Sequence, residues 1–304
     1  MDTPRIAILG PGRLGQVLAR RWCEAGLPLL GFLGRDPERA RAAVAFAGGG
    51  RVLDVAALRG ADVVLVAVQD DRLPAVVAEV VAESKGVCGG LWVHGSGSHD
   101  LDVLEPARRG GARVGSLHPA CALPTPEVGY ASLPGQPAVL LARPDDPRTA
   151  AELVQLATAA GLRPVPAGGS DRLLYHTACV LAANGLTALY SVVADLLQRA
   201  APGAALVEVG DALMRGALDG CVRHGAAAAL SGPVVRGDAA LVARQVARLD
   251  CSDPSAAAVY RSLMKRAVEL AAGRGELAGQ ALAAVQGALA GSDDSASEGG
   301  PWPK

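Results

Sequence analysis

Three glycines in the segment Gly10-Pro11-Gly12-Arg13-Leu14-Gly15 have the spacing at which a chain can cradle a diphosphate. The segment follows an apolar stretch, Arg5 to Leu9, that predicts a strand, and it opens a stretch that predicts a helix. In such a unit Gly10 permits the tight turn, Gly12 lets the backbone approach the phosphates, and Gly15 lets the helix pack closely on the strand. The free N–H groups at the start of the helix would then face the phosphates. The spacing therefore predicts a dinucleotide-binding turn.

The end of the second predicted strand, Pro28 to Leu33, bears on which dinucleotide is bound. An NAD-specific site places an acidic residue there, on the ribose hydroxyls. This chain has Gly34 and Arg35 instead, and Arg35 can offer a planar fork of hydrogen bonds to a ribose 2′-phosphate. The alternative is that Asp36 contacts the ribose, although an Asp before Pro37 is typical of a helix cap. We expect NADP (NADPH) as the cofactor.

A histidine and an asparagine lie on a predicted helix in the second half of the chain. Hydride delivery to a carbonyl or an imine needs a proton source beside the nicotinamide, and histidine exchanges a proton near neutral pH. His176 and Asn184 are eight residues apart, about 80° around an α-helix, so both can border one cleft. We expect His176 to be a catalytic acid and Asn184 to hydrogen-bond the substrate. The alternatives are structural: a histidine packed at a domain seam and an asparagine bonded to nearby backbone.

Three further polar residues are candidates for the same site. His118 and Ser96 follow predicted strands, and ligands gather at the carboxyl ends of parallel strands; turn chemistry is the alternative for both. Arg236 could bind a substrate carboxylate through its guanidinium, or could belong to a surface loop. The histidines and acidic residues within positions 94–100 stand in Gly-rich sequence that gives no fixed presentation, so no metal site is expected.

Alternation of short apolar runs with amphipathic stretches from Arg5 to about Pro166 indicates a mainly parallel sheet covered by helices. After residue 170 the apolar residues recur at three- and four-residue spacing, which predicts helices through Ala290. The expected fold class is α/β: a Rossmann doubly wound parallel sheet followed by an all-α C-terminal domain. The expected domains are 1–168 for NADP binding, 169–290 for substrate and dimerisation, and a disordered tail at 291–304. Strands are expected at 5–9, 28–33, 63–68, 91–94, 113–117, 138–141 and 162–165, and helices include 13–25, 37–47, 73–83, 171–200, 204–224, 239–249, 254–273 and 276–290.

Composition narrows the classes of partner. The net charge of the 304-residue chain is -1, which offers no field for nucleic acid or anionic lipid. Apolar runs such as Val63 to Val68 are far shorter than the ~20 residues of a membrane span, and Met1 to Gly10 lacks the pattern of a secretory signal. We therefore expect a cytoplasmic protein without nucleic-acid or membrane partners. The six cysteines are scattered without paired spacing, so we expect buried thiols.

Several segments together resemble a known superfamily. The glycine segment, Gly34 to Ala40 and Ala61 to Val68 look like the N-terminal half of the ketopantoate reductase and pyrroline-5-carboxylate reductase superfamily, which is 6-phosphogluconate dehydrogenase-like. His176 to Leu189 resembles the long helix of ketopantoate reductases, on which a lysine and an asparagine meet the substrate. Three further segments, 94–98, 115–119 and 231–238, resemble a branch of Rossmann-fold reductases with a poorly characterised C-terminal helical domain.

One departure from this family pattern concerns the proton donor. His176 stands where ketopantoate reductases carry a catalytic lysine, and the lysines of this chain are Lys85, Lys265 and Lys304. A lysine acid–base mechanism at this position is therefore excluded.

The resemblance implies an NADPH-dependent oxidoreductase that reduces the carbonyl of a small oxo acid, with ketopantoate as the best single expectation. An imine reductase of the pyrroline-5-carboxylate type is the alternative within enzymes, and a non-catalytic NADPH-binding sensor or scaffold is the alternative outside them. The Ala-rich helical domain is expected to form a homodimer, because exposed apolar helix faces need covering.

Overall fold

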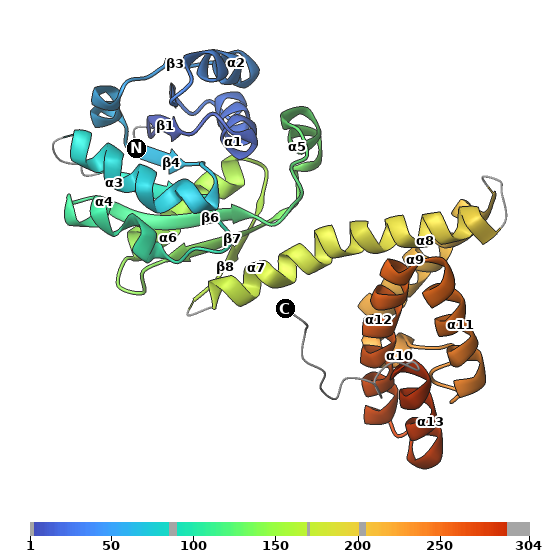
Figure 1. Cartoon of the computed structure of the whole chain (residues 1–304). Helices are drawn as coiled ribbons and strands as arrows, with labels where there is room; N and C mark the ends of the chain where they lie inside the picture. Colours follow the sequence, from blue (N-terminus) through green and yellow to red (C-terminus); the bar gives the residue numbers. More distant parts are fainter. Residues whose placement is uncertain (1–2, 85–89, 169–170, 201–204, 291–304) are drawn as a thin grey trace, which may run out of the picture. The chain divides into compact units, whose positions relative to one another are not determined.

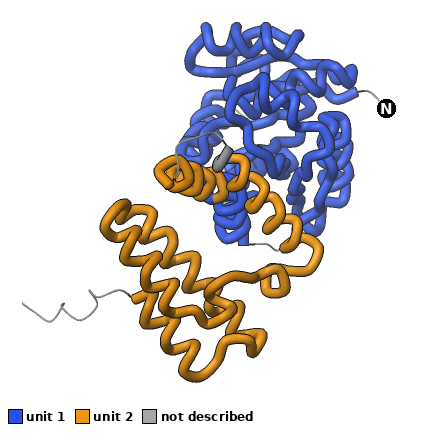
Figure 2. Tube along the Cα trace, turned by 90° about the vertical axis from the view of Figure 1, so that its right-hand side faces the viewer, with its two compact units in different colours: residues 1–185 blue, residues 186–304 orange. Residues whose placement is uncertain are grey.

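The computed structural model describes residues 3–84, 90–168, 171–200 and 205–290. The predicted tail at 291–304, like Cys88 and Lys85, lies outside these residues. The chain forms two compact units, Met1–Gly185 and Leu186–Lys304, which Figure 2 colours separately. The strands end at Pro166, near the expected domain boundary, and the compact units divide 19 residues further along, within a helical stretch.

The first unit contains an eight-stranded sheet in the order β3-β2-β1-β4-β5-β6-β7-β8. Its neighbouring strands are parallel except for β6 and β7, which are antiparallel. The predicted fold class is confirmed: a mostly parallel Rossmann-type sheet followed by an all-helical region. The strands are β1 (Ile6–Leu9), β2 (Leu29–Leu33), β3 (Arg51–Val52), β4 (Val63–Val66), β5 (Leu91–His94), β6 (Arg113–Pro119), β7 (Pro137–Ala142) and β8 (Arg163–Pro166).

Two apolar clusters cover the two faces of this sheet, because successive side chains of a strand point to opposite faces. In β1, Ile6 and Ile8 enter one cluster, whereas Ala7 and Leu9 enter the other. Helices α1, α2 and α6 pack on the first face and α3 and α4 on the second, so the unit has three layers (Figure 1). The helices of this unit are α1 (Arg13–Glu24), α2 (Pro37–Ala47), α3 (Leu73–Glu83), α4 (Glu105–Arg109), α5 (Pro126–Ser132), α6 (Pro147–Ala159) and α7 (Arg172–Val180), with short 3₁₀ turns η1 (Val55–Gly60), η2 (Asp70–Arg72) and η3 (Leu101–Leu104).

The regular secondary structure that the structure describes in the second unit consists of helices. A separate core, which includes Val242, Val246 and Val268, joins its last three helices. Its helices are α8 (Leu186–Ala200), α9 (Ala205–His224), α10 (Ala226–Ala229), α11 (Ala239–Ser252), α12 (Pro254–Gly273) and α13 (Gly279–Ala290).

A long apolar helical stretch, Arg172–Ala200, runs through α7, the π-helical turn η4 (Leu181–Gly185) and α8. Among the described residues it is the one helix long and apolar enough to cross a membrane by length and composition, with a mean hydropathy of 1.6 over its most apolar window. None of that window is buried within the structure. The sequence-based expectation of no span considered only uninterrupted apolar runs. Helices that pack against another protein share these features.

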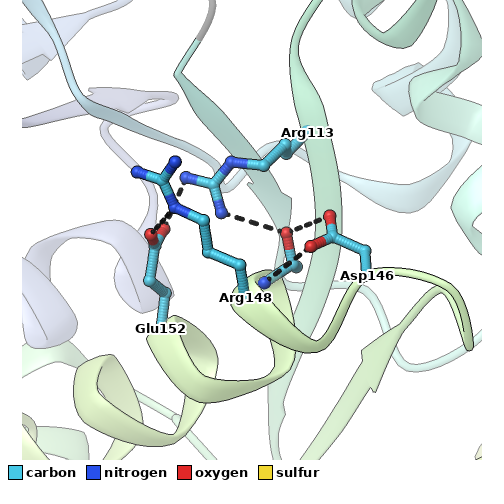
Figure 3. A network of polar contacts seen from close by, with 5 residues as sticks. Arg113, Asp146, Arg148 and Glu152 are labelled. Atoms are coloured by element: carbon cyan, nitrogen blue, oxygen red, sulfur yellow. Dashed lines mark hydrogen bonds and ion pairs between the residues drawn. The ribbon is translucent and has the colours of Figure 1, made fainter.

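A network of polar contacts holds β6 to α6 at the amino edge of the sheet (Figure 3). Arg113, the first residue of β6, donates to Thr149 Oγ1 at 3.2 Å and to Glu152 Oε2 at 2.6 Å. Arg148 shares the same Glu152 carboxylate at 3.0 Å. These arginines line a cavity of about 1030 Å³, but their charge is already shared with this carboxylate. The contacts thus fix the beginning of the strand whose other end carries His118.

Candidate active site

The carboxyl ends of five neighbouring strands open onto a cleft of about 710 Å³. Strand β1 lies between β2 and β4. The chain therefore adds β2 and β3 on one side of β1 and β4 and β5 on the other. Open α/β sheets bind ligands at such a switch point. The lining combines the predicted glycine segment with the ends of the other strands. It includes Gly10, Pro11, Gly12, Arg13, Leu14, Arg35, Asp70, His118 and His176.

The first and last glycines of the glycine segment, Gly10 and Gly15, have no room for a side chain. Gly10 has a φ of 108°, and a Cβ there would lie 2.6 Å from the carbonyl oxygen of Ala67. A Cβ at Gly15 would lie 2.7 Å from the carbonyl oxygen of Gly10. Gly12 caps α1 without a side-chain hydrogen bond, and the first turn of α1 has no acidic residue. This geometry leaves the helix start available to an anion and fits a dinucleotide diphosphate.

Arginines gather beside the end of β2. Arg35 and Arg39 both line the cleft and are exposed. Asp36 is used as the N-cap of α2, where its Oδ1 accepts from the backbone N–H of Glu38 at 2.9 Å. The carboxylate is therefore engaged in the cap, as an Asp before Pro37 suggests, and the guanidinium groups remain to meet a ribose 2′-phosphate. Sequence reasoning missed Arg39, which lies one turn of α2 beyond the cap.

Two histidines that line the cleft contact each other. His118 is the penultimate residue of β6 and His176 lies on α7, and their rings pack edge to face with centroids 6.0 Å apart. Gly97 lies against both: a Cβ there would be 2.6 Å from His176 Cδ2 and 2.8 Å from His118 Nε2. The structure thus brings together two residues that are 58 positions apart in the sequence and that were predicted separately.

Two residues on the first turns of α7 support His118 and were not predicted. The hydroxyl oxygen of Tyr175 lies 2.9 Å from His118 Nδ1. The guanidinium carbon of Arg172 lies 4.7 Å from the centroid of the Tyr175 ring, and Arg172 Nη2 donates to the carbonyl oxygen of Ser96 at 3.3 Å. Arg172 is 4% exposed, and its Nε and Nη1 have no hydrogen-bond partner among the described residues. The i, i+4 spacing of Arg172 and His176 was the available sequence signal.

The charge states at this site follow from burial. Burial lowers the pKa of His118 to about 4, assisted by the positive charge of Arg172. His94, at the end of β5, is fully buried, and its pKa falls to about 3 for the same leading reason. Burial also lowers the pKa of Arg172 and raises the pKa of the Tyr175 hydroxyl. At neutral pH His118 and His94 are therefore uncharged, and Tyr175 keeps its proton.

Ser96 belongs to a turn that is stabilised by its own hydrogen bonds. Its Oγ accepts from the backbone N–H groups of Ser98 and His99, each at 3.2 Å. Ser98 Oγ donates to Asp70 Oδ2 at 2.5 Å, which ties the turn to the start of η2, after β4. Ser96 is 7% exposed, and it does not line the cleft. These bonds fit the turn-chemistry alternative for Ser96.

The remaining predicted residues, Asn184 and Arg236, come from other parts of the chain. Asn184 is exposed in the π-helical turn Leu181–Gly185 and is not among the cleft-lining residues. The extra residue of that turn alters the angular spacing from His176 that a regular α-helix would give. Arg236 is exposed in the second unit, two residues before Asp238, which caps α11. Within the described ranges no group of three or more His, Cys, Asp or Glu side chains is placed to hold a metal ion.

Two family models match separate parts of the chain. Residues 5–88 match the family described as NADP oxidoreductase, coenzyme F420-dependent, and residues 140–267 match a domain of unknown function, DUF2520. No curated protein sequence matches the chain. The N-terminal match, which contains the glycine segment and Arg35, identifies an oxidoreductase that uses NADP(H).

Solved structures share the fold over most of the chain. A candidate NADP oxidoreductase from Bacteroides fragilis is 21% identical with a TM-score of 0.69, covering 87% of this chain and 98% of its own. An imine reductase from Pseudomonas sp. is 21% identical with a TM-score of 0.62, covering 95% and 100%. A reductive aminase from Aspergillus terreus, solved with NADPH and ethyl-5-oxohexanoate, is 16% identical with a TM-score of 0.58, covering 95% and 93%. At these identities the likeness shows a common fold.

Proposed function

We propose that the chain reduces the carbonyl group of a small oxo acid with NADPH, in the manner of ketopantoate reductases. One observation carries the proposal: His118 and His176 line the same cleft as Gly10 to Leu14 of the glycine segment. In a Rossmann domain the diphosphate binds at the first turn and the nicotinamide lies along the carboxyl edge of the sheet. The two imidazoles then border the reacting carbon.

Different residues of the chain would bind the cofactor and assist the reduction. The turn at residues 10–15 would hold the diphosphate and Arg35, with Arg39, the 2′-phosphate. When bound, NADPH supplies the hydride. His118 and His176 would supply the hydrogen bond and the proton that the substrate oxygen needs. Asn184 and Arg236 remain proposed substrate-binding residues, and substitution of either by alanine would raise KM for the oxo acid more than it lowers kcat.

Reduction of an imine is the second candidate, and the names of two solved structures with this fold favour it. An iminium substrate arrives protonated, so that it needs no acid from the protein. Binding of NADPH without turnover is the third candidate, a sensor or scaffold.

One assay separates these candidates. Purified protein is mixed with NADPH and a panel of 2-oxo acids and cyclic imines, and loss of reduced nicotinamide is followed together with the nucleotide-dependent rise in melting temperature. Oxo-acid-dependent oxidation supports the proposal, and oxidation only with imines supports the second candidate. A rise in melting temperature without oxidation supports the sensor, because binding stabilises whether or not chemistry follows.

We also propose a homodimer that covers apolar residues of the helical region. Leu213, Leu218 and Val222 of α9 are 68%, 55% and 78% exposed. Sedimentation of the full chain should give a dimer, and a Leu213→Glu, Val222→Glu double variant should shift it toward monomer. Val128→Glu on α5, at a residue 50% exposed in the first unit, is the matched control. A wild-type monomer would refute the proposal.

A further inference from the structure

The contact between Tyr175 and His118 has a direction that hydrogen-bond chemistry determines. A neutral imidazole has one N–H donor and one nitrogen that accepts strongly, whereas a phenol has one O–H. The 2.9 Å separation of the Tyr175 oxygen and His118 Nδ1 is an ordinary hydrogen-bond length. Cys179, one helical turn beyond Tyr175, lies near the tyrosine and contributes to raising the pKa of its hydroxyl, but sulfur is a weak acceptor. Of the two directions that this distance allows, donation by the Tyr175 hydroxyl to Nδ1 pairs the more acidic O–H with the more basic nitrogen, and this is the direction we assign.

This direction decides which nitrogen of His118 carries the hydrogen. With Nδ1 occupied as an acceptor, the neutral ring must hold its proton on Nε2. Nε2 faces the point where Gly97 and the His176 ring converge, because a Cβ at Gly97 would lie 2.8 Å from it. His118 lines the cleft, so its N–H is presented beside the place where the nicotinamide edge of a Rossmann site lies.

The surroundings of His118 keep the ring neutral over a broad pH range. Arg172 and His176 face it and disfavour a second proton, whereas Asp70 favours one. Burial outweighs the carboxylate and holds the pKa near 4. Around neutral pH the ring is thus a hydrogen-bond donor through Nε2 and does not carry a positive charge.

We infer that Tyr175 is a positioning residue that holds His118 as an N–H donor, and that the reducible group of the substrate is an acceptor, a carbonyl oxygen, and not a protonated imine nitrogen. This inference rests on the proposed function for its second half. When hydride adds to a carbonyl carbon, the electron pair of the broken π bond goes to oxygen, and that charge strengthens the bond from Nε2–H. An iminium nitrogen has no lone pair, and its N–H would face the N–H of His118.

The tautomer can be measured without any turnover. Protein labelled with ¹⁵N-histidine gives signals from five histidines, and His118→Gln identifies those of His118. The wild type should show a protonated Nε2 and an unprotonated Nδ1 near neutral pH, and Tyr175→Phe should give a mixture of both tautomers. Tyr190→Phe, on α8, should leave the signals unchanged. A wild-type Nδ1–H, or an unaltered tautomer in Tyr175→Phe, would overturn the positioning role even if the chain proved to be an oxo-acid reductase.

Kinetics test the substrate half. Tyr175→Phe should lower kcat for a 2-oxo acid about 10- to 100-fold and leave the Kd for NADPH within about threefold, because the diphosphate turn is untouched. Turnover of cyclic imines should fall by less than about threefold in the same variant. Two results would overturn the assignment of a carbonyl acceptor while leaving the NMR result standing. In one, the wild-type protein reduces imines but no oxo acid. In the other, Tyr175→Phe lowers kcat equally for both substrate classes.

Discussion

Gly97 offers the sharpest single perturbation of the proposed site. It lies on the turn after β5 and outside the left-handed region of φ, so its backbone would accept alanine without strain. The effect of Gly97→Ala therefore comes only from the steric contact of its new methyl group with the two histidines. The new methyl carbon would lie 2.6 Å from His176 Cδ2 and 2.8 Å from His118 Nε2, where ordinary contacts begin at 3.4 Å.

The difference between these distances and an ordinary contact sets the size of the expected loss in kcat. One or both imidazoles must retreat by about 0.6 to 0.8 Å, and a displacement of about 1 Å at a reacting centre costs up to about 100-fold in rate. We expect kcat for the oxo acid to fall about 10- to 100-fold, and we expect overpacking to cost about 1–3 kcal/mol of stability. The Kd for NADPH should change little, because Gly97 is not part of the glycine segment.

Steady-state kinetics and nucleotide titration of the purified variant measure these effects. Gly287→Ala on α13 is the matched control, since a Cβ there has nothing within 4 Å; it should keep full activity and gain about 0.5–1 kcal/mol in the free energy of unfolding. Unchanged kcat in Gly97→Ala would refute the placement of the two histidines at the reacting centre.

Three further predictions follow from the same geometry. Arg35→Ser should weaken NADPH binding about 10- to 100-fold, as expected for loss of a charge-assisted hydrogen bond worth about 1.5–3 kcal/mol, and should leave NADH binding unchanged; equal losses for both nucleotides would contradict a 2′-phosphate contact. Gly15→Val should abolish NADPH-dependent stabilisation, because a Cβ there meets the Gly10 carbonyl at 2.7 Å; a retained shift in melting temperature would argue against the turn. The pKa of His94 is near 3 in the folded chain and about 6.5 in the unfolded chain, so the unfolded chain takes up the proton at higher pH. The free energy of unfolding should therefore fall as the pH drops below about 6.5, by up to about 1.4 kcal/mol per pH unit. Unfolding at several pH values should give a shallower loss for His94→Leu, and identical slopes would refute an uncharged buried His94.

Local patterns allowed most of the first unit to be predicted. The strands and helices around the glycine segment follow from period-two and 3.6-residue patterns, and the cap at Asp36 follows from the proline after it. The two-residue strand β3 and the antiparallel pairing of β6 with β7 had no such signal. Both depend on contacts between strands that only the folded sheet provides.

The supporting residues of the site were harder to predict because they act across long sequence separations. Tyr175 meets His118 across 57 positions and Arg172 meets Ser96 across 76. Neither residue type is unusual in a helix, so burial and partners, which the sequence does not state, give them their chemical character. The geometry expected for Asn184 assumed a regular helix, and the π-helical turn at 181–185 replaces it. Such turns often occur at functional sites, but sequence periodicity does not reveal them.

A crystal structure of the chain soaked with NADP and a 2-oxo acid tests the central claim most directly. We predict the diphosphate at residues 10–15, the 2′-phosphate on Arg35, and His118 Nε2 within hydrogen-bond distance of the substrate oxygen beside nicotinamide C4. A nicotinamide bound away from both His118 and His176 would contradict the account.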